Sequence, residues 1–390
     1  MAYGALRHRL GSTRGFEGLV EGNRVTLLHD GVQCYPAMLE AIAAAEREVL
    51  LEMYWFGSDR TGWRFAEALM EKARAGIPVD VIYDAVGSIE ADGALFDALR
   101  DAGCRVLEYN PIAPWRQRFR LGVVNNRNHR KMLIVDRKIG FTGGVNIGDP
   151  WAPEEEGGEG WRDDMIRIEG PAVEFMRRIF LHGWKSTVGG TPPRASEPPA
   201  EELEDGEADA RVRVLANHYF GERRAIRRAY LERLRAAERC IYITNSYFVP
   251  DRRIRRILAQ AVRRGVEVRV LVPGVGDVPA VWYAGRKLYG WLRDHGIHVH
   301  EWRGVILHAK TAVVDGAWCT VGTYNLDYRS WRSNLEVTVA IEDEAVAGAL
   351  EAKFHEDLEN APPVDWRAFR YRSLGDRFFE NFFYLFRKLL

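Results

Sequence analysis

Two short segments, far apart in the chain, carry histidine, lysine and aspartate at the same spacing. Each segment reads H-x-K-x-x-x-x-D, and the six residues are His129, Lys131, Asp136, His308, Lys310 and Asp315. The chain contains only eight lysines, so two complete copies of this pattern indicate a shared chemical role rather than coincidence. These six residues are therefore the candidate catalytic residues.

A histidine and a lysine two positions apart are suited to a phosphate group. Residues two apart in a strand share one face, so the histidine and lysine of each segment are expected to project together. A lysine ammonium neutralises charge on phosphate oxygens, while an imidazole can attack phosphorus or shuttle a proton. We expect the two aspartates of the pattern, in contrast, to hold the strand and the turn that follows it.

Two further pairs of polar residues repeat downstream of these segments. Gly143-Gly144-Val145-Asn146 corresponds to Gly322-Thr323-Tyr324-Asn325, and the small residues allow backbone and amide groups to approach a phosphate closely. Asn146 and Asn325 are thus candidate phosphate-binding residues. Asp163 and Glu336 each precede an alternating strand. A carboxylate there can accept a hydrogen bond from a histidine and fix its tautomer, so these two are candidate histidine-orienting residues.

The elements that position these residues follow from a longer internal repeat. The expected strand-helix-strand units comprise residues 49–51, 62–75 and 79–83 in the first half and residues 241–243, 254–262 and 266–272 in the second. Both helices stop at a glycine, Gly76 or Gly265, as a left-handed C-cap requires. Such units imply parallel strand pairing, so we predict an α/β fold that arose by tandem duplication.

The composition of one segment divides the chain. Residues 187–209 are rich in Gly, Pro, Glu and Asp and have few large apolar side chains, which is typical of an exposed linker. We therefore predict a first domain at residues 1–186, a linker at 187–209, a second domain at 210–360 and a C-terminal tail at 361–390.

Size and charge narrow the possible functions. The 390 residues suffice for two domains, and 55 basic residues balance 55 acidic ones, so the molecule has no overall electrostatic bias toward nucleic acid. The four cysteines are scattered, and we expect them to be reduced core residues. Neither a signal peptide nor a membrane-spanning stretch is expected, which places the protein at the cytoplasmic side, at most lying on a membrane.

The paired segments and their surroundings resemble the phospholipase D superfamily. The resemblance runs from about Arg24 to Leu390 and includes G-G-V-N-I-G-D after the first segment and G-T-Y-N-L-D-Y-R-S-W-R-S-N-L-E after the second. Within the superfamily, the chain is most similar to bacterial cardiolipin synthases of the short type that lacks N-terminal membrane-spanning helices. Thr323 departs from the serine that is common at its position. The resemblance implies two phospholipase D-like α/β domains packed as a pseudo-dimer around one shared active site.

The resemblance also implies a mechanism without metal or other cofactor. One histidine attacks the phospholipid phosphorus to form a phosphohistidine, and the other serves as general acid and base. By analogy with the family, His129 is the nucleophile and His308 the acid/base, although the pseudo-symmetry leaves the reverse open. Lys131, Lys310 and the two asparagines would hold the phosphate oxygens. The implied substrates are two molecules of phosphatidylglycerol, with phosphatidylethanolamine as an alternative donor.

Two segments are candidates for peripheral membrane contact. The C-terminal tail ends in an aromatic-rich, basic stretch, residues 378–390, that suits an interfacial helix or, equally, a helix packed on the core. Residues 115–127 combine four arginines with Trp115 and Phe119 and could meet anionic headgroups or form a solvated loop. The sequence carries no signal for oligomeric state.

Three classes of function remain distinct at this point. A lipid phosphatidyltransferase agrees best with both intact segments and the aromatic C-terminus. A hydrolase of phospholipids, or a nuclease of the same superfamily, uses the same motifs, but neutral net charge argues against nucleic acid as a partner. A catalytically inactive scaffold would be expected to have lost at least one motif residue. Transfer and hydrolysis differ in how well the site excludes water, which the sequence does not fix.

Overall fold

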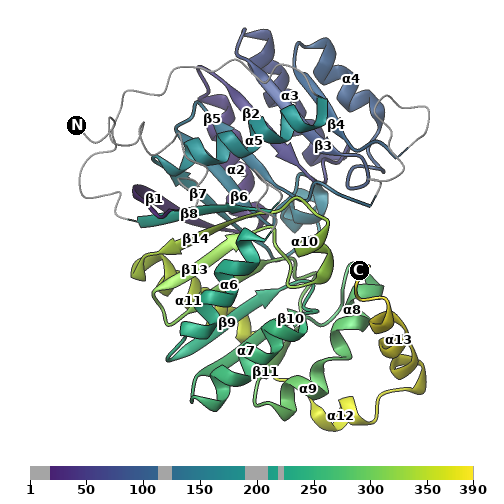
Figure 1. The fold of residues 1–390 in the computed structure, drawn as a ribbon. Coiled ribbons are helices and arrows are strands. Elements are labelled where there is room, and N and C mark those ends of the chain that lie inside the picture. Colours follow the sequence, from purple (N-terminus) through teal and green to yellow (C-terminus); the bar gives the residue numbers. More distant parts are fainter. Residues whose placement is uncertain (1–17, 113–124, 189–209, 218–223, 390) are drawn as a thin grey trace.

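A computed structural model describes residues 18–112, 125–188, 210–217 and 224–389 of the chain. These residues form one mixed sheet of 14 strands with helices packed against it (Figure 1). The strand order is β11-β10-β9-β12-β13-β14-β8-β1-β7-β6-β5-β2-β3-β4. Counted outward from the central β8–β1 pair, the two halves have the same order. The predicted α/β class and tandem duplication are therefore confirmed.

The first half contains the elements up to the end of α5. Its strands are β1 (Val20–His29), β2 (Val49–Met53), β3 (Val79–Asp84), β4 (Arg105–Tyr109), β5 (Met132–Val135), β6 (Ile139–Gly143) and β7 (Asp164–Glu169). Its helices are α2 (Asp30–Ala43), α3 (Arg60–Arg74), α4 (Gly93–Asp101) and α5 (Ala172–Val188), with short 3-10 turns η3 (Asp149–Trp151) and η4 (Glu154–Glu156).

The second half repeats this plan. Its strands are β8 (Ala210–Ala216), β9 (Cys240–Asn245), β10 (Glu267–Pro273), β11 (His298–Trp302), β12 (Lys310–Val314), β13 (Trp318–Gly322) and β14 (Val337–Glu342). Its helices are α6 (Ala225–Ala236), α7 (Arg252–Arg263), α8 (Pro279–Arg286), α9 (Tyr289–Asp294), α10 (Tyr328–Arg332) and α11 (Glu344–Glu359), followed by α12 (Trp366–Arg370) and α13 (Leu374–Leu385).

Parallel pairing occurs where the strand-helix-strand units predicted it. β2 pairs in parallel with β3 and β9 with β10, and the helix between each pair ends before a glycine with positive φ, Gly76 at 86° and Gly265 at 91°. The strands that follow the histidines, β5 and β12, instead pair antiparallel on both sides. Each half is therefore mixed, because short turns join β5 to β6 and β12 to β13.

The two halves meet at an antiparallel seam between β1 and β8. Only Val20 with Val212 and Asn23 with Ala210 are in register there, and a shift separates the two pairs. The buried Asn23 side chain reinforces the seam, since its Nδ2 donates to the Ala210 carbonyl at 3.4 Å while its Oδ1 accepts from Ala172 N at 2.8 Å. Pairing of β1 with β8 therefore joins the sheets of the two repeats into one continuous sheet.

Buried apolar clusters lie on both faces of the sheet. One cluster joins α2, α3 and α4 to the first half, a second joins α6, α7 and α9 to the second half, and a third under α5 and α11 is shared by both. All four cysteines are free and buried, as predicted. Of the predicted linker, residues 187–209, the first two end α5 and residues 189–209 lie outside the described residues. The chain from residue 361 onward forms α12 and α13, and α13 packs against α8.

Candidate active site

Each histidine lies in an extended segment that is held by the opposite half of the molecule. His129 N donates to the Leu335 carbonyl at 2.9 Å, and His308 N donates to the Arg162 carbonyl at 2.7 Å. The sequence predicted histidine and lysine within one strand, but both histidines precede the regular strand, and only Lys310 belongs to it. The reason is that these segments pair with residues 162 and 335 across the seam rather than with their own neighbours.

The histidine–carboxylate pairs cross between the halves. Nδ1 of His129 lies 3.0 Å from Glu336 Oε2, and Nδ1 of His308 lies 2.7 Å from Asp163 Oδ2. Both carboxylates are fully buried. With Nδ1 engaged in this way, the Nε2 atom of each ring is left for chemistry.

Buried polar neighbours fix the two carboxylates. Trp151 Nε1 donates to Asp163 at 2.9 Å, while Thr323 Oγ1 donates to Glu336 at 2.5 Å, so the hydroxyl at this unusual position contacts the site. Arg162 anchors the backbone next to Asp163, because its buried guanidinium binds Asp357 of α11 through Nε and Nη2 and Asp164 through Nη1. Contacts between the two halves therefore hold each carboxylate beside the histidine of the other half.

The two lysines are buried beside the histidines. Lys131 Nζ donates to the His129 carbonyl at 2.9 Å and lies 4.9 Å from the Tyr54 ring centre. Lys310 Nζ donates to the His308 carbonyl in the same way. Burial, followed by the charge of Lys310, lowers the pKa of Lys131 to about 7, and burial lowers that of Lys310 to about 8. Two ammonium groups held out of water stabilise an anion that enters between them.

Burial lowers the pKa of both histidines. Burial lowers the pKa of His129 to about 4, against the opposing influence of Glu336, so this ring is neutral near pH 7. Burial and the charge of Lys310 also lower the pKa of His308. Burial disfavours the ionised form of Asp163, but the neighbouring His308 and Lys310 more than offset this and leave its pKa below the usual value.

The two candidate phosphate-binding asparagines border the same space as the histidines. His129, His308, Asn146 and Asn325 all line one pocket of about 180 Å³. The side-chain oxygens are occupied, since Asn146 Oδ1 accepts from Trp55 N at 3.1 Å and Asn325 Oδ1 accepts from Ser246 Oγ at 3.0 Å. Their amide groups are thereby oriented, with the NH2 end as the donor for a ligand.

The motif aspartates do not border this pocket and instead have the structural surroundings that the sequence led us to expect for them. Asp136 accepts from the backbone N–H groups of residues 46, 47 and 48, and Asp315 accepts from those of residues 238, 239 and 240. Each stands at the far end of its strand from the histidine, in a left-handed conformation with φ of 54° or 56°. Asp136 thus fixes the loop that leads into β2, and Asp315 fixes the loop that leads into β9.

Several pocket residues were not singled out from the sequence as site residues. Trp151 and Trp161 lie 5.3 Å and 6.1 Å from His308 between ring centres, and Trp55 contacts both tryptophans. Arg127 and Arg329 line the pocket too. Their positions in the sequence could have indicated them, because Trp161 is two residues before Asp163 and Arg127 is two residues before His129.

One more pocket residue is an acid without a cation partner in the described part of the chain. Asp327 is buried, caps α10 by accepting from Ser330 N at 2.7 Å, and borders the pocket. Burial raises its pKa to about 7. Its carboxyl is thus poised to donate as well as to accept a hydrogen bond near neutral pH. Within the described ranges, no group of three or more His, Cys, Asp or Glu residues could hold a metal ion.

Comparisons with known proteins show the family to which the chain belongs. Residues 38–158 and 230–358 match the family described as "Cardiolipin synthase, PLD-like domain". The chain is 34% identical to a cardiolipin synthase of Geobacillus sp. (strain WCH70), covering 96% of this chain and 73% of that protein. It is 30% identical to cardiolipin synthase 1 of Bacillus anthracis, covering 96% of this chain and 74% of the relative.

The fold also matches a solved structure. The crystal structure of phosphatidylserine synthase from Haemophilus influenzae Rd KW20 superposes with a TM-score of 0.72, covering 99% of this chain and 100% of that chain at 14% identity. At this identity the match concerns the fold alone, and it extends over both halves.

Proposed function

Because the chain belongs to the cardiolipin synthase family of phospholipase D-like proteins, we propose that it joins two molecules of phosphatidylglycerol into cardiolipin and releases glycerol. The observation that carries the proposal is the meeting of both histidines at one pocket, each with a buried lysine bonded to its carbonyl and a carboxylate from the other half bonded to its ring. That arrangement provides two distinct bases and two cations around a single phosphate.

The first step forms a covalent intermediate. Nε2 of neutral His129 attacks the phosphorus of the donor phosphatidylglycerol, and the bond from phosphorus to the glycerol headgroup oxygen breaks. His308 gives its proton to the departing oxygen, so glycerol leaves neutral. Neutral His129 has the lone pair that attack requires. Because burial lowers the pKa of His308 as well, the choice of His129 as nucleophile follows the family analogy.

The second step transfers the phosphatidyl group. His308, now neutral, takes the proton from the headgroup hydroxyl of a second phosphatidylglycerol, whose oxygen attacks phosphorus as the bond to His129 breaks. Glu336 and Asp163 act as positioning residues that keep each Nδ1 protonated and each ring oriented. Lys131, Lys310 and the amides of Asn146 and Asn325 stabilise the phosphate oxygens.

The environment of His308 favours an alcohol over water as the second nucleophile. Trp151 and Trp161 pack around the ring that activates this nucleophile, and both are buried. Apolar walls at this position reduce the amount of water beside the base while the phosphohistidine waits. Phosphatidylethanolamine, which also has a headgroup alcohol as its leaving group, is an alternative donor.

We further propose that the protein lies peripherally on the cytoplasmic face of the membrane through its C-terminal helix. Among the described residues, no helix has both the length and the apolarity needed to cross a bilayer. α13 exposes a row of large apolar side chains, namely Leu374, Phe378, Phe379, Phe382 and Leu385. It packs on α8, whose Val281 borders the pocket, so insertion of α13 would bring the site near its lipid substrates.

The test is incubation of the purified protein with phosphatidylglycerol vesicles in the presence of a chelator, with lipid products read by mass spectrometry. The proposal expects cardiolipin and glycerol, both lost in His129→Ala. Phosphatidic acid as the sole product would instead establish a hydrolase. Absence of any lipid product from the intact protein would contradict the proposal and direct the search to other phosphodiesters, starting with single-stranded DNA.

A further inference from the structure

Two neighbouring helices of the second half carry a concentrated positive charge. α6 and α7 together contain nine arginines and one glutamate, a formal charge of +8, in a chain whose net charge is zero. The helices at the same places in the first half, α2 and α3, contain four basic and four acidic residues and are neutral. We call the outward surface of α6 and α7 the arginine face.

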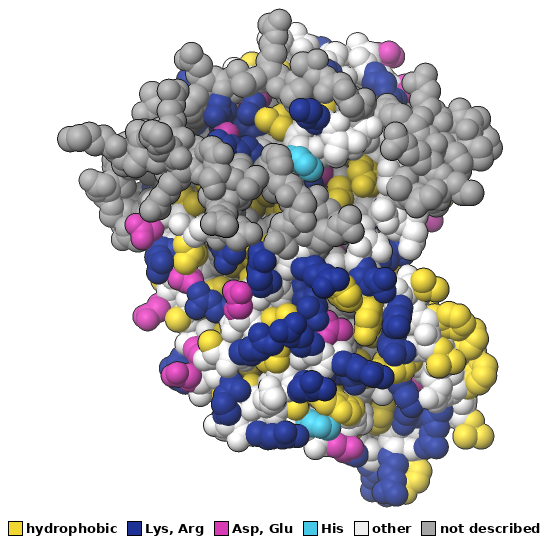
Figure 2. All heavy atoms as spheres, viewed as in Figure 1, with side chains coloured by type: hydrophobic (Ala, Val, Ile, Leu, Met, Phe, Trp, Pro, Cys, Tyr) yellow, Lys and Arg dark blue, Asp and Glu magenta, His cyan; other side chains and the backbone are white. Residues whose placement is uncertain are grey.

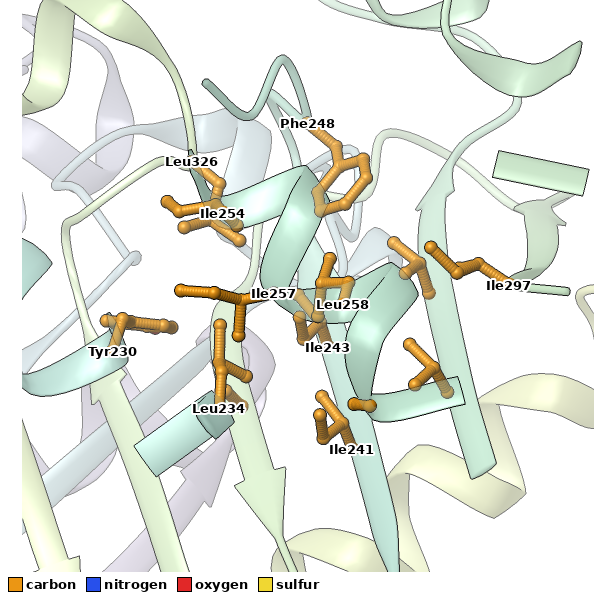
Figure 3. Packing of buried hydrophobic residues seen from close by; sticks show 14 of the residues in the cluster. Tyr230, Leu234, Ile241, Ile243, Phe248, Ile254, Ile257, Leu258, Ile297 and Leu326 are labelled. Carbon is orange, nitrogen blue, oxygen red and sulfur yellow. The ribbon is translucent and has the colours of Figure 1, made fainter. Parts of the chain in front are cut away.

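The arginine face points to solvent. Figure 2 shows Lys and Arg side chains gathered over the half of the molecule where Figure 1 places α6 and α7. The opposite side of α7 is apolar and buried, with Ile254, Ile257 and Leu258 packed toward the sheet (Figure 3). Its exposed arginines are Arg252, Arg253, Arg256 and Arg263, and none of the four forms an ion pair with a described residue.

The fold does not require these charges. α3 covers the first half of the sheet in the equivalent position with a formal charge of +2, against +5 for α7. Arginines spaced three and four apart on one helix, such as Arg252 with Arg256, repel each other and destabilise it by a few tenths of a kcal/mol per pair. A surface that is unfavourable for the isolated fold indicates an anionic partner.

The arginine face runs into the apolar surface of the C-terminal helices. Arg255 of α7 lies 5.1 Å from the ring centre of Trp291 in α9, and Tyr289 of α9 stacks on Phe369 of α12 at 5.5 Å. α12 leads into α13, and hydrophobic side chains appear at the edge of the same view in Figure 2. A basic area beside exposed phenylalanines matches the two layers of a membrane surface, the charged headgroups and the acyl boundary beneath them.

We propose that the arginine face is a docking surface for the headgroups of an anionic lipid bilayer. This inference rests on the proposed function, because phosphatidylglycerol, the proposed substrate, is itself the anionic lipid. The arginines provide the charge-dependent part of membrane attachment, whereas α13 provides the apolar part. The surface also raises the local concentration of anionic substrate around the protein relative to neutral lipid.

The experiment compares vesicle binding of two variants with equal change in charge. In the first, four arginines of α7 are replaced: Arg252→Gln, Arg253→Gln, Arg256→Gln and Arg263→Gln. In the matched control, the four basic residues of α3 are replaced: Arg60→Gln, Arg64→Gln, Lys72→Gln and Arg74→Gln. Binding of the full chain to vesicles of phosphatidylglycerol or of phosphatidylcholine is measured by sedimentation, at low and at high salt.

We expect the partition coefficient of the α7 variant on phosphatidylglycerol vesicles to be at least roughly 100-fold lower than that of the unmodified protein. The partition coefficient of the α3 variant should stay close to that of the unmodified protein. The preference of the unmodified protein for phosphatidylglycerol over phosphatidylcholine should disappear at high salt. Equal loss in both variants would overturn the proposal, as would unchanged binding of the α7 variant. If the α7 variant lost affinity for single-stranded DNA but bound vesicles normally, the face would belong to a nucleic acid.

A second measurement separates this inference from the proposed reaction. Turnover of a short-chain, water-soluble phosphatidylglycerol does not need vesicle docking, so the α7 variant should retain the rate of the unmodified protein in that assay. If the unmodified protein bound vesicles but turned over no phosphatidylglycerol, the proposed function would be wrong while the proposed docking surface would still hold. Loss of soluble turnover in the α7 variant would show that the substitutions damage the site rather than the surface.

Discussion

The two halves of the protein share a strand order but give their histidines different surroundings. His129 lies edge-on to Tyr54, 4.9 Å between ring centres, and its carboxylate partner is 3.0 Å away. His308 lies against Trp151 and Trp161, and its partner is 2.7 Å away. A duplicated fold has thus produced two similar rings in unlike environments, which is the condition for one to act as nucleophile and the other as acid and base.

The largest effects are expected from removing either histidine. His129→Ala and His308→Ala should each lower cardiolipin formation by at least roughly 10³-fold. They should differ with a donor whose leaving group is p-nitrophenol, since this group departs without a proton. Mass spectrometry should then find phosphatidyl–enzyme in His308→Ala but not in His129→Ala. The opposite pattern would exchange the two roles.

Replacing either buried carboxylate should lower activity less than replacing a histidine, and it should test which carboxylate pairs with which histidine. Glu336→Gln and Asp163→Asn are expected to lower kcat by about 10²- to 10⁴-fold, because each removes the acceptor that orients a ring. In imidazole NMR spectra, Glu336→Gln should shift the resonances of His129 alone, and Asp163→Asn those of His308 alone. A shift of the histidine in the same half would contradict the crossed pairing.

The lysine pair should set the alkaline limit of activity. Lys131, whose pKa is lowered to about 7, is charged below that pH and loses its charge above it. If the charge holds the phosphate, kcat/KM falls as pH rises through the range of about 7 to 8, given by both lysines. Lys131→Arg, whose side chain stays charged, should move the falling limb to higher pH while lowering the maximum. An unmoved limb would assign the titration to another group.

The smallest effects concern stability rather than chemistry. Asp136→Ala removes the acceptor of three backbone N–H groups in a nearly buried site, so we expect a loss of about 3 kcal/mol in the free energy of unfolding. Asp315→Ala removes equivalent bonds in a more exposed site and should cost about 1–2 kcal/mol. Urea unfolding measures both. Folded Asp136→Ala should keep near-normal turnover, and a large loss of turnover in the folded variant would restore this residue to the catalytic set.

Local signals in the sequence were sufficient for much of the fold. The apolar runs at 49–51 and 241–243 and the glycines at 76 and 265 predicted two strand-helix-strand units, because strand burial and helix termination are decided within a few residues. The repeat comparison also singled out His129, His308, Asn146 and Asn325, all of which line the pocket. Antiparallel pairing of β5 and β12 was not predicted, since a short buried strand carries no mark of its neighbour's direction.

The sequence singled out Asp163 and Glu336 as histidine-orienting residues, but not which carboxylate meets which histidine. Glu336 meets His129 and Asp163 meets His308 only because β1 docks on β8, and that seam joins residues nearly 190 positions apart. No local pattern encodes such a contact. The place of Trp161 beside His308 depends on the same docking of the two halves and was not predicted either.

The crossed pairs also determine when the enzyme can become active during its synthesis. A ribosome that has completed the first half has made His129, Lys131 and Asn146, but Glu336 is still to come. Until β14 is in place, the imidazole of His129 has no carboxylate to orient it. His308 is missing from such a chain too, so the proposed two-histidine reaction has to wait until the second half has been made.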